Sequence, residues 1–250
     1  MRGGFLRTGL ITTCLLLASM SAFAGQVRVA VASNFAETIR AIAALYQEQT
    51  GHSVLISTGS TGKHYAQIRN GAPFDVFLAA DARRPALLEQ EGIAQPGSRY
   101  TYAIGRLVLW SPKADMVDKH GRVLEQGGFR YLAIANPKLA PYGRAAQQFL
   151  ESRGLWADMQ GRLVRGENIS QAYQYVASGN AELGLVAYAQ IRQPEVAVTG
   201  SFWPVPQELY DPIEQQAVLL KDEDLARDFL DFVRSDEART VIRSYGYGVP

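Results

Sequence analysis

The organisation of this chain follows from one segment, Leu55-Ile56-Ser57-Thr58-Gly59-Ser60-Thr61-Gly62-Lys63-His64-Tyr65-Ala66-Gln67-Ile68. The pattern indicates the end of a β-strand, a turn rich in glycine and hydroxyl groups, and the first turns of a helix. Such a junction presents unpaired backbone N–H groups and the positive end of the helix dipole at one point, which suits an anion. Glycine and serine also form ordinary turns and helix caps, so this segment alone leaves both interpretations open.

The length and composition indicate an ordinary globular protein. At 250 residues the chain can form one large domain or two smaller ones, each with its own core. No low-complexity tract or block of like charges indicates a disordered tail. The formal net charge of +1 provides no bulk attraction for nucleic acid, so we expect no nucleic-acid partner.

The first 24 residues have the features of a secretory signal peptide. Arg2 and Arg7 precede an apolar run at 10–18, and Ala22-Phe23-Ala24 is a small-x-small cleavage site. The apolar run is short for a membrane span. The single cysteine, Cys14, lies in this segment, so the mature chain has no disulfide. Loss of Arg2 and Arg7 lowers the 25 basic residues to 23 against 24 acidic ones, a net charge of −1. Any attraction for an anion must therefore be local.

Strands alternate with helices along the mature chain. Extended apolar runs at 27–32, 52–57, 74–80, 131–135, 162–165, 184–187 and 215–220 are separated by helical patterns, including 83–91, 143–152 and 169–177. This alternation predicts an α/β fold with mainly parallel sheets. The spacing of Asn34 and Glu37 is that of a capping box, Gly51 is expected to end the first long helix, and one amphipathic helix closes the chain.

We expect two lobes joined by two crossing segments, one near Tyr102 and one near Pro212. Lobe I then comprises 25–101 and 213–250, and lobe II comprises 102–212. In open parallel sheets, ligands bind at the carboxyl ends of the strands. Four strand-to-helix turns are expected there, two from each lobe: Ser33-Asn34, Gly59-Ser60-Thr61-Gly62, Pro141-Tyr142-Gly143 and Asn168-Ile169-Ser170.

Four converging helix ends could neutralise a dianion without lysine or arginine. A site made of donors favours a fully deprotonated tetrahedral oxyanion over monohydrogen phosphate, whose proton requires an acceptor. Each turn residue considered alone is also a common helix cap. Glu167 beside the fourth turn would repel an anion unless it points away, and Lys63 does not fit the phosphate-loop pattern.

Catalytic and metal-binding patterns are absent from the sequence. It has no Gly-x-Ser-x-Gly elbow and no His-Glu-x-x-His helix. The three histidines, His52, His64 and His120, are scattered and the mature chain has no cysteine, so we expect no zinc site. Asp75 and Asp81 are expected to be structural. We therefore expect that this protein is not an enzyme.

Several segments resemble one known family in both order and spacing. They are Val29-Ala30-Val31-Ala32-Ser33-Asn34-Phe35, the Ser-Thr-Gly-Ser-Thr-Gly turn at 57–62, Asn70-Gly71-Ala72-Pro73-Phe74-Asp75-Val76-Phe77, Ile134-Ala135-Asn136-Pro137 through Ala140-Pro141-Tyr142-Gly143, and Tyr245-Gly246-Tyr247. Together they resemble the periplasmic molybdate-binding proteins of molybdate ABC importers, over essentially the whole mature chain.

The resemblance implies a two-lobe periplasmic binding protein of type II, with the ligand in the cleft between the lobes. Such a protein captures molybdate or tungstate by hydrogen bonds and delivers it to an inner-membrane ABC permease. We accordingly expect a periplasmic monomer without a cofactor. Molybdenum would be present only as the bound oxyanion, with no direct protein ligand to the metal.

The resemblance also implies which residues hold the oxyanion. Family members use a hydroxyl of the first turn, a hydroxyl and N–H groups of the second, and a backbone N–H of the fourth. In this chain these positions are, in order, Ser33 with its neighbour Asn34, Thr61 with its neighbour Ser60, and Ile169.

A tyrosine hydroxyl completes the expected site, and its origin differs among family members. Some supply it directly after the strand at 184–187, where this chain has Ala187. Others supply it from an Ala-Pro-Tyr-Gly loop, which this chain has, so we expect Tyr142 to contact the ligand. Tyr188, one position away from the first arrangement, is the alternative.

Two other functions stay open at this point. A sulfate or thiosulfate receptor would use the same donors, and competition binding would distinguish it. A phosphoryl-transfer enzyme could use the Gly-Ser-Thr-Gly-Lys turn at 59–63, but it would need Mg²⁺ ligands that the sequence does not offer.

Overall fold

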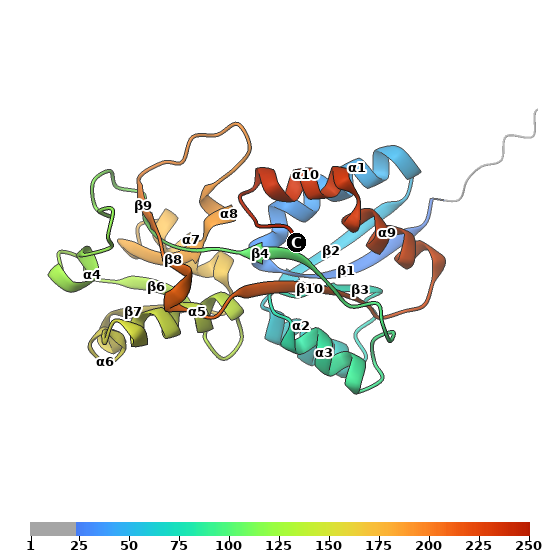
Figure 1. Ribbon diagram of the computed structural model, residues 1–250, viewed down its shortest axis with the longest axis horizontal. Helices are drawn as coiled ribbons and strands as arrows, with labels where there is room; N and C mark the ends of the chain where they lie inside the picture. The colour runs from blue at the N-terminus through green and yellow to red at the C-terminus, as the bar shows by residue number, and fades with distance from the viewer. Residues whose placement is uncertain (1–23) are drawn as a thin grey trace, which may run out of the picture.

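The computed structural model describes residues 24–250. The predicted signal peptide lies outside the described residues, except for Ala24. Two five-stranded sheets lie beside each other along the long axis of the molecule (Figure 1). Their strand orders are β2-β1-β3-β10-β4 and β7-β6-β8-β5-β9. Helices flank both sheets, so the predicted α/β fold with two lobes of mainly parallel sheet and flanking helices is confirmed.

The first sheet combines the beginning and the end of the chain. Its strands are β1 (Gln26–Ala32), β2 (Ser53–Gly59), β3 (Val76–Leu78), β4 (Tyr100–Gly105) and β10 (Ile213–Leu219). β1 pairs in parallel with β2 and β3, whereas β10 runs antiparallel between β3 and β4. Helices α1 (Ala36–Thr50), α9 (Asp224–Arg234) and α10 (Asp236–Ser244) cover one face (Figure 1). The other face carries α2 (Thr61–Arg69) and α3 (Arg83–Gln90).

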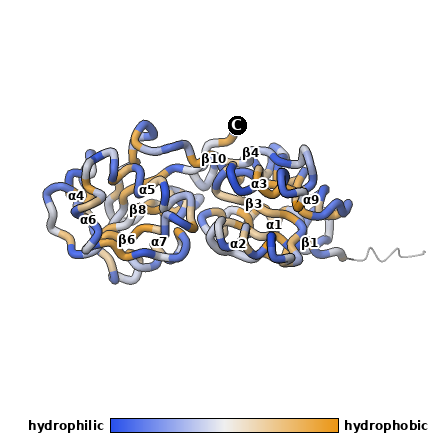
Figure 2. Tube along the Cα trace, turned by 90° about the horizontal axis from the view of Figure 1, so that it is seen from below, coloured by the Kyte–Doolittle hydropathy of each residue, from blue (hydrophilic) through white to orange (hydrophobic). Residues whose placement is uncertain are grey.

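Side chains alternate between the two faces along each strand. Helices cover both faces of this sheet, so the side chains on both faces are buried. Val27, Val29 and Val31 of β1 pack into the core beneath α1, α9 and α10, while Ala30 packs into the core beneath α2 and α3. Figure 2 shows the result, with hydrophobic strands inside and hydrophilic segments outside.

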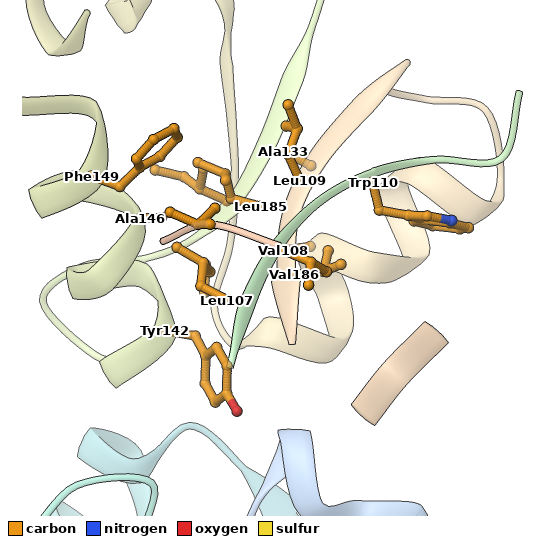
Figure 3. Close-up of a cluster of buried hydrophobic side chains, with 14 of the residues drawn as sticks. Leu107, Val108, Leu109, Trp110, Ala133, Tyr142, Ala146, Phe149, Leu185 and Val186 are labelled. Atoms are coloured by element: carbon orange, nitrogen blue, oxygen red, sulfur yellow. The ribbon is translucent and has the colours of Figure 1, made fainter. Parts of the chain in front are cut away.

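The second sheet is built from the middle of the chain. Its strands are β5 (Leu107–Ser111), β6 (Leu132–Ala135), β7 (Leu163–Gly166), β8 (Leu183–Ala187) and β9 (Ser201–Pro204). Its helices are α4 (Val123–Gln126), α5 (Pro141–Ser152), α6 (Trp156–Met159), α7 (Ile169–Ala177) and α8 (Tyr188–Ile191). The described chain also has short 3-10 helices: η1 (Ser33–Phe35) follows β1 of the first sheet, and η2 (Gln160–Arg162) and η3 (Gln207–Leu209) lie in the middle of the chain. One continuous core joins β5, β8 and α5, and Figure 3 shows Leu107, Leu185 and Phe149 within it.

Two connections join the sheets. Arg106 alone separates β4 of the first sheet from β5 of the second, and the chain returns between Tyr210 and Ile213. β4 and β10 are paired, so both connections leave the first sheet side by side (Figure 1). β4 stays paired with β10 as far as Gly105, so the first sheet continues beyond residue 101. The lobe limits at 101/102 and 212/213 stay a prediction.

Two local predictions are wrong. Asn34 does not cap the first helix, because α1 begins after the turn η1 and the Asn34 side chain bonds elsewhere. The closing helix is divided at Ser235, whose hydroxyl accepts the Ala238 N–H at 3.1 Å and starts α10 as a separate helix. The helix end at Gly51 is confirmed, with the left-handed φ of 75° that glycine readily adopts. Between residues 24 and 250, none of the helices has the length and apolar character needed to cross a membrane.

Asp75 is a structural residue beneath the first sheet. Its carboxylate is almost fully buried and lies 2.9 Å from the Arg28 guanidinium and 3.0 Å from the Lys221 ammonium. It also accepts the Arg28 backbone N–H at 2.8 Å. Burial raises the pKa of this carboxyl, but the hydrogen bonds and charges of Arg28 and Lys221 lower the pKa by more, so the net shift is downward.

We predict that Asp75→Asn lowers the free energy of unfolding at neutral pH by about 2–3 kcal/mol. This is at or below the low end for a broken buried pair because Arg28 and Lys221 are partly exposed. Since the folded pKa is depressed, the contribution of Asp75 is present above about pH 4 and is lost as the pH falls through the folded pKa. Denaturant unfolding at neutral and acidic pH measures both effects. Asp231→Asn, at an exposed pair with Arg234, is the control. Equal stability of the Asp75 variant and the parent would contradict this account.

Candidate functional site

A small cavity of about 10 Å³ lies between the two sheets. All six predicted site residues line it: Ser33, Asn34, Ser60, Thr61, Tyr142 and Ile169. Its other lining residues are Ala32, Gly59, Ala80, Ala140, Pro141 and Asn168. None of the lining residues is charged. The four turns predicted to converge therefore do so, and each begins a helix: η1, α2, α5 and α7.

The turn before α2 is held by its own hydroxyls. Ser60 is the N-cap, and its Oγ accepts the Lys63 N–H at 3.3 Å. Thr61 Oγ1 accepts the Ala80 N–H at 3.0 Å. Because each oxygen already accepts a backbone hydrogen bond, each hydroxyl keeps its proton free to donate to a ligand.

Two amides remain for a ligand at the starts of α2 and α7. The Gly62 N–H donates to Leu139 O at 2.8 Å, and the Ser170 N–H donates to Ser33 Oγ at 3.4 Å. The first amide of each helix, that of Thr61 in α2 and of Ile169 in α7, has no hydrogen-bond partner among residues 24–250. First-turn amides cannot bond within their own helix, so these two groups can serve an anion.

Contacts between the lobes close the cavity on the side of Ser33. The Ser33 hydroxyl donates to Asn168 Oδ1 at 3.2 Å, and the Ser170 hydroxyl donates to Ser33 O at 3.1 Å. Asn168 also caps α7 by accepting the Gln171 N–H at 3.1 Å. The Asn168 cap proposed from the sequence is thus present, and it additionally holds the two lobes together.

Asn34 lines the cavity, but its side chain is committed elsewhere. Its Nδ2 donates to Gln215 Oε1 at 2.7 Å and to the Tyr247 hydroxyl at 3.1 Å. Both amide protons are therefore used inside the first lobe, and only the backbone N–H of Asn34 is left for a ligand. No local pattern in the sequence indicates Gln215, which lies on β10, far along the chain.

Tyr142 lies at the start of α5, and its hydroxyl points away from the second core toward the first lobe (Figure 3). The side chain is fully buried, and its hydroxyl has no hydrogen-bond partner within the described chain. Burial raises the pKa of Tyr142 well above its ordinary value, so the group is a neutral donor. The alternative, Tyr188, begins α8 and does not line the cavity.

Glu167 and Lys63 lie near the site without lining it. Glu167 Oε1 is 3.0 Å from Lys63 Nζ, in an ion pair that joins the two lobes. This contact answers the question raised by the sequence, because the negative charge next to the fourth turn is neutralised by its partner. The donors that face the cavity are therefore uncharged amides and hydroxyls.

Positively charged side chains instead line a larger adjoining cavity of about 360 Å³. It shares Ala80, Ala140 and Pro141 with the small cavity and is lined by Arg83, Arg84, Lys138 and Arg144, together with Asp81 and Asp211. Arg84 pairs with Asp81, and its guanidinium also donates to Lys138 O of the other lobe at 3.3 Å. These charges can attract an anion toward the cleft while the inner cavity stays neutral.

Comparison with known proteins gives three consistent results. The family model described as bacterial extracellular solute-binding protein matches residues 27–248. The molybdate-binding protein ModA of Azotobacter vinelandii is 49% identical over 93% of this chain and 94% of its own length. That of Rhodobacter capsulatus is 47% identical over 97% of this chain and 96% of its own. The solved periplasmic molybdate-binding protein of Azotobacter vinelandii superposes with a TM-score of 0.87 at 45% identity, covering 90% of this chain and 99% of that protein.

The Lys63–Glu167 pair leads to a prediction about single substitutions. Lys63→Met leaves an unpaired carboxylate near a bound dianion, whereas Glu167→Gln leaves an unpaired ammonium. Both side chains are more than a third exposed, so we expect effects within about 1 kcal/mol. Lys63→Met should weaken dianion binding by up to about fivefold, and Glu167→Gln should leave it unchanged or slightly stronger. Titrations at low and high ionic strength measure this, because salt screens exposed charges. An equal loss of dianion affinity in the two variants would show that the ion pair acts only by holding the two lobes together.

Proposed function

This chain belongs to the family of bacterial extracellular solute-binding proteins, and we propose that it captures molybdate, as its ModA relatives are named for doing. It binds the oxyanion between its two lobes and delivers it to the permease of an ABC importer. Its role is binding and transport, not catalysis. The observation that supports this most directly is the convergence of four helix N-termini on a cavity without charged lining residues.

Both lobes contribute proposed donors, the larger number coming from lobe I. Lobe I, 25–101 with 213–250, supplies the hydroxyls of Ser60 and Thr61 and the amides of Asn34 and Thr61. It also supplies the Ser33 hydroxyl, whose proton must turn from Asn168 Oδ1 to the ligand. Lobe II, 102–212, supplies the Tyr142 hydroxyl and the Ile169 amide. A ligand held from both sides favours closure by a hinge movement at the two connections. The resulting protein is a periplasmic monomer, exported by a cleaved signal peptide, and it needs no cofactor.

The uncharged site also determines the proposed selectivity. Helix ends and hydroxyls stabilise two negative charges by donation. Monohydrogen phosphate would bring a proton into a site of donors and is disfavoured. Sulfate has the charge of molybdate but is smaller, so it cannot reach the donors of both lobes equally well.

We predict that calorimetric titration gives tight binding of molybdate and tungstate, much weaker binding of sulfate, and weaker binding still of phosphate. Tungstate should be close to molybdate because the two oxyanions have nearly the same size and charge. Competition between molybdate and sulfate measures the ratio directly. Sulfate binding as tight as molybdate binding would overturn the proposed substrate and favour a sulfate receptor.

Substitution of the hydroxyl donors tests the proposed residues. Ser33→Ala and Thr61→Ala should each weaken molybdate binding by about 1.5–3 kcal/mol, the range for hydrogen bonds to charged groups. Thr61→Ser keeps the hydroxyl and should retain most of the affinity. Thr58→Ala, at an exposed position of β2, is the matched control and should bind as the parent does. Unchanged affinity in both Ser33→Ala and Thr61→Ala would place the ligand elsewhere.

A further inference from the structure

Three buried side-chain atoms have no hydrogen-bond partner within the described chain: the Tyr142 hydroxyl, Gln215 Nε2 and His64 Nε2. The first two come from different lobes. Gln215 is fully buried on β10, two residues after the chain re-enters the first sheet, and Tyr142 starts α5 of the other lobe. A buried donor left without a hydrogen-bond partner destabilises the folded protein. Two such atoms therefore call for a common explanation.

Both atoms face the same small space beside Gly105. A Cβ built on Gly105 would lie 2.3 Å from the Tyr142 hydroxyl oxygen and 3.1 Å from Gln215 Nε2. Gly105 is the last residue of β4, at the connection between the sheets. Its missing side chain leaves room for the two polar groups to approach each other.

Hydrogen-bond donors fix the orientation of the Gln215 amide. The Tyr247 hydroxyl donates its only proton to Asn34 O at 2.8 Å, so it must accept from the Asn34 side chain, which places Nδ2 toward it. The same Nδ2 lies 2.7 Å from the Gln215 side chain, whose facing atom must then be the acceptor Oε1. The Tyr102 hydroxyl lies 3.2 Å from both this oxygen and Ala79 O, so it can donate its one proton to either. Nε2 is consequently directed away from Asn34, toward the space that it shares with Tyr142.

We propose that Gln215 is a positioning residue for Tyr142: its Nε2 donates to the Tyr142 hydroxyl oxygen when that hydroxyl donates to the bound oxyanion. This inference rests on the proposed function. A tyrosine hydroxyl has one proton and can also accept. If Gln215 occupies the accepting side, the tyrosine proton is directed at the ligand. The bond joins the two lobes beside Gly105, at the first connection between the sheets.

The arrangement links three parts of the molecule through one side chain. Oε1 of Gln215 holds Asn34 of the first turn, Nε2 holds Tyr142 of the other lobe, and the residue itself lies on a strand that leads to the second connection. Loss of the Nε2 donor should therefore weaken the ligand contact of Tyr142 without removing any group that touches the ligand.

A double-mutant cycle with molybdate tests the proposal. Tyr142→Phe should weaken binding more than tenfold, and Gln215→Leu should weaken it about tenfold when Tyr142 is present. In the Tyr142→Phe background, the effect of Gln215→Leu should be at least threefold smaller, because its partner hydroxyl is already gone. Loss of the Asn34 acceptor is common to both backgrounds and cancels in the cycle. Gln216→Leu, at the adjacent residue whose amide bonds Thr101 and Arg99, should have the same effect in both backgrounds.

If Gln215→Leu fails to fold, a second variant and a spectroscopic measurement still test the proposal. Gln215→Glu keeps the acceptor for Asn34 and Tyr102 but replaces the N–H donor, and the same cycle applies to it. In ¹⁵N NMR spectra, the Gln215 side-chain amide resonances should move when molybdate is added to the parent protein, and not in the Tyr142→Phe variant.

The outcomes separate the two claims. If Tyr142→Phe leaves the affinity unchanged, the proposed role of Tyr142 in ligand binding is wrong. If Tyr142→Phe weakens binding but both Gln215 substitutions act equally in the two backgrounds, the positioning role is overturned and the proposed function stands. Unchanged Gln215 resonances on addition of molybdate would also overturn the positioning role.

Discussion

The first amides of an α-helix have no partner within the helix, and this constraint organises the whole site. The chain uses most of them internally, through the caps at Ser60 and Asn168 and through contacts between the lobes. The amides of Thr61 and Ile169 are left over, one from each lobe. In the proposed function a bound oxyanion would supply the acceptors that these amides lack, and the ligand would then complete the hydrogen bonding of the protein itself.

Uncharged donors also explain how selectivity is obtained by a chain with almost no net charge. An arginine would attract any anion of suitable size, whereas an amide attracts only where an acceptor oxygen lies at the correct distance and direction. The cations remain in the adjoining larger cavity, where Arg83 and Lys138 can attract anions of every kind. Attraction and discrimination are thus assigned to neighbouring but separate surfaces.

The sequence predicted those features that depend on a few neighbouring residues. The Ser60 turn, the Asn168 cap and the helix end at Gly51 each follow from local chemistry, and all are present. The prediction that Asn34 caps the first helix was wrong, because the Asn34 side chain bonds to Gln215 and Tyr247, which are 181 and 213 residues away. No periodicity in the chain indicates such pairs. The family resemblance favoured Tyr142 over Tyr188, and of the two only Tyr142 lines the cavity.

The position of β10 has a consequence for biogenesis. This strand lies inside the first sheet between β3 and β4, and Tyr247, almost the last residue, holds the turn that contains Asn34. Until its final residues have left the ribosome, a nascent polypeptide has no complete first lobe. Premature termination anywhere before β10 would therefore release a product without a functional receptor surface, and proteases would meet it as an unfinished sheet with exposed edges.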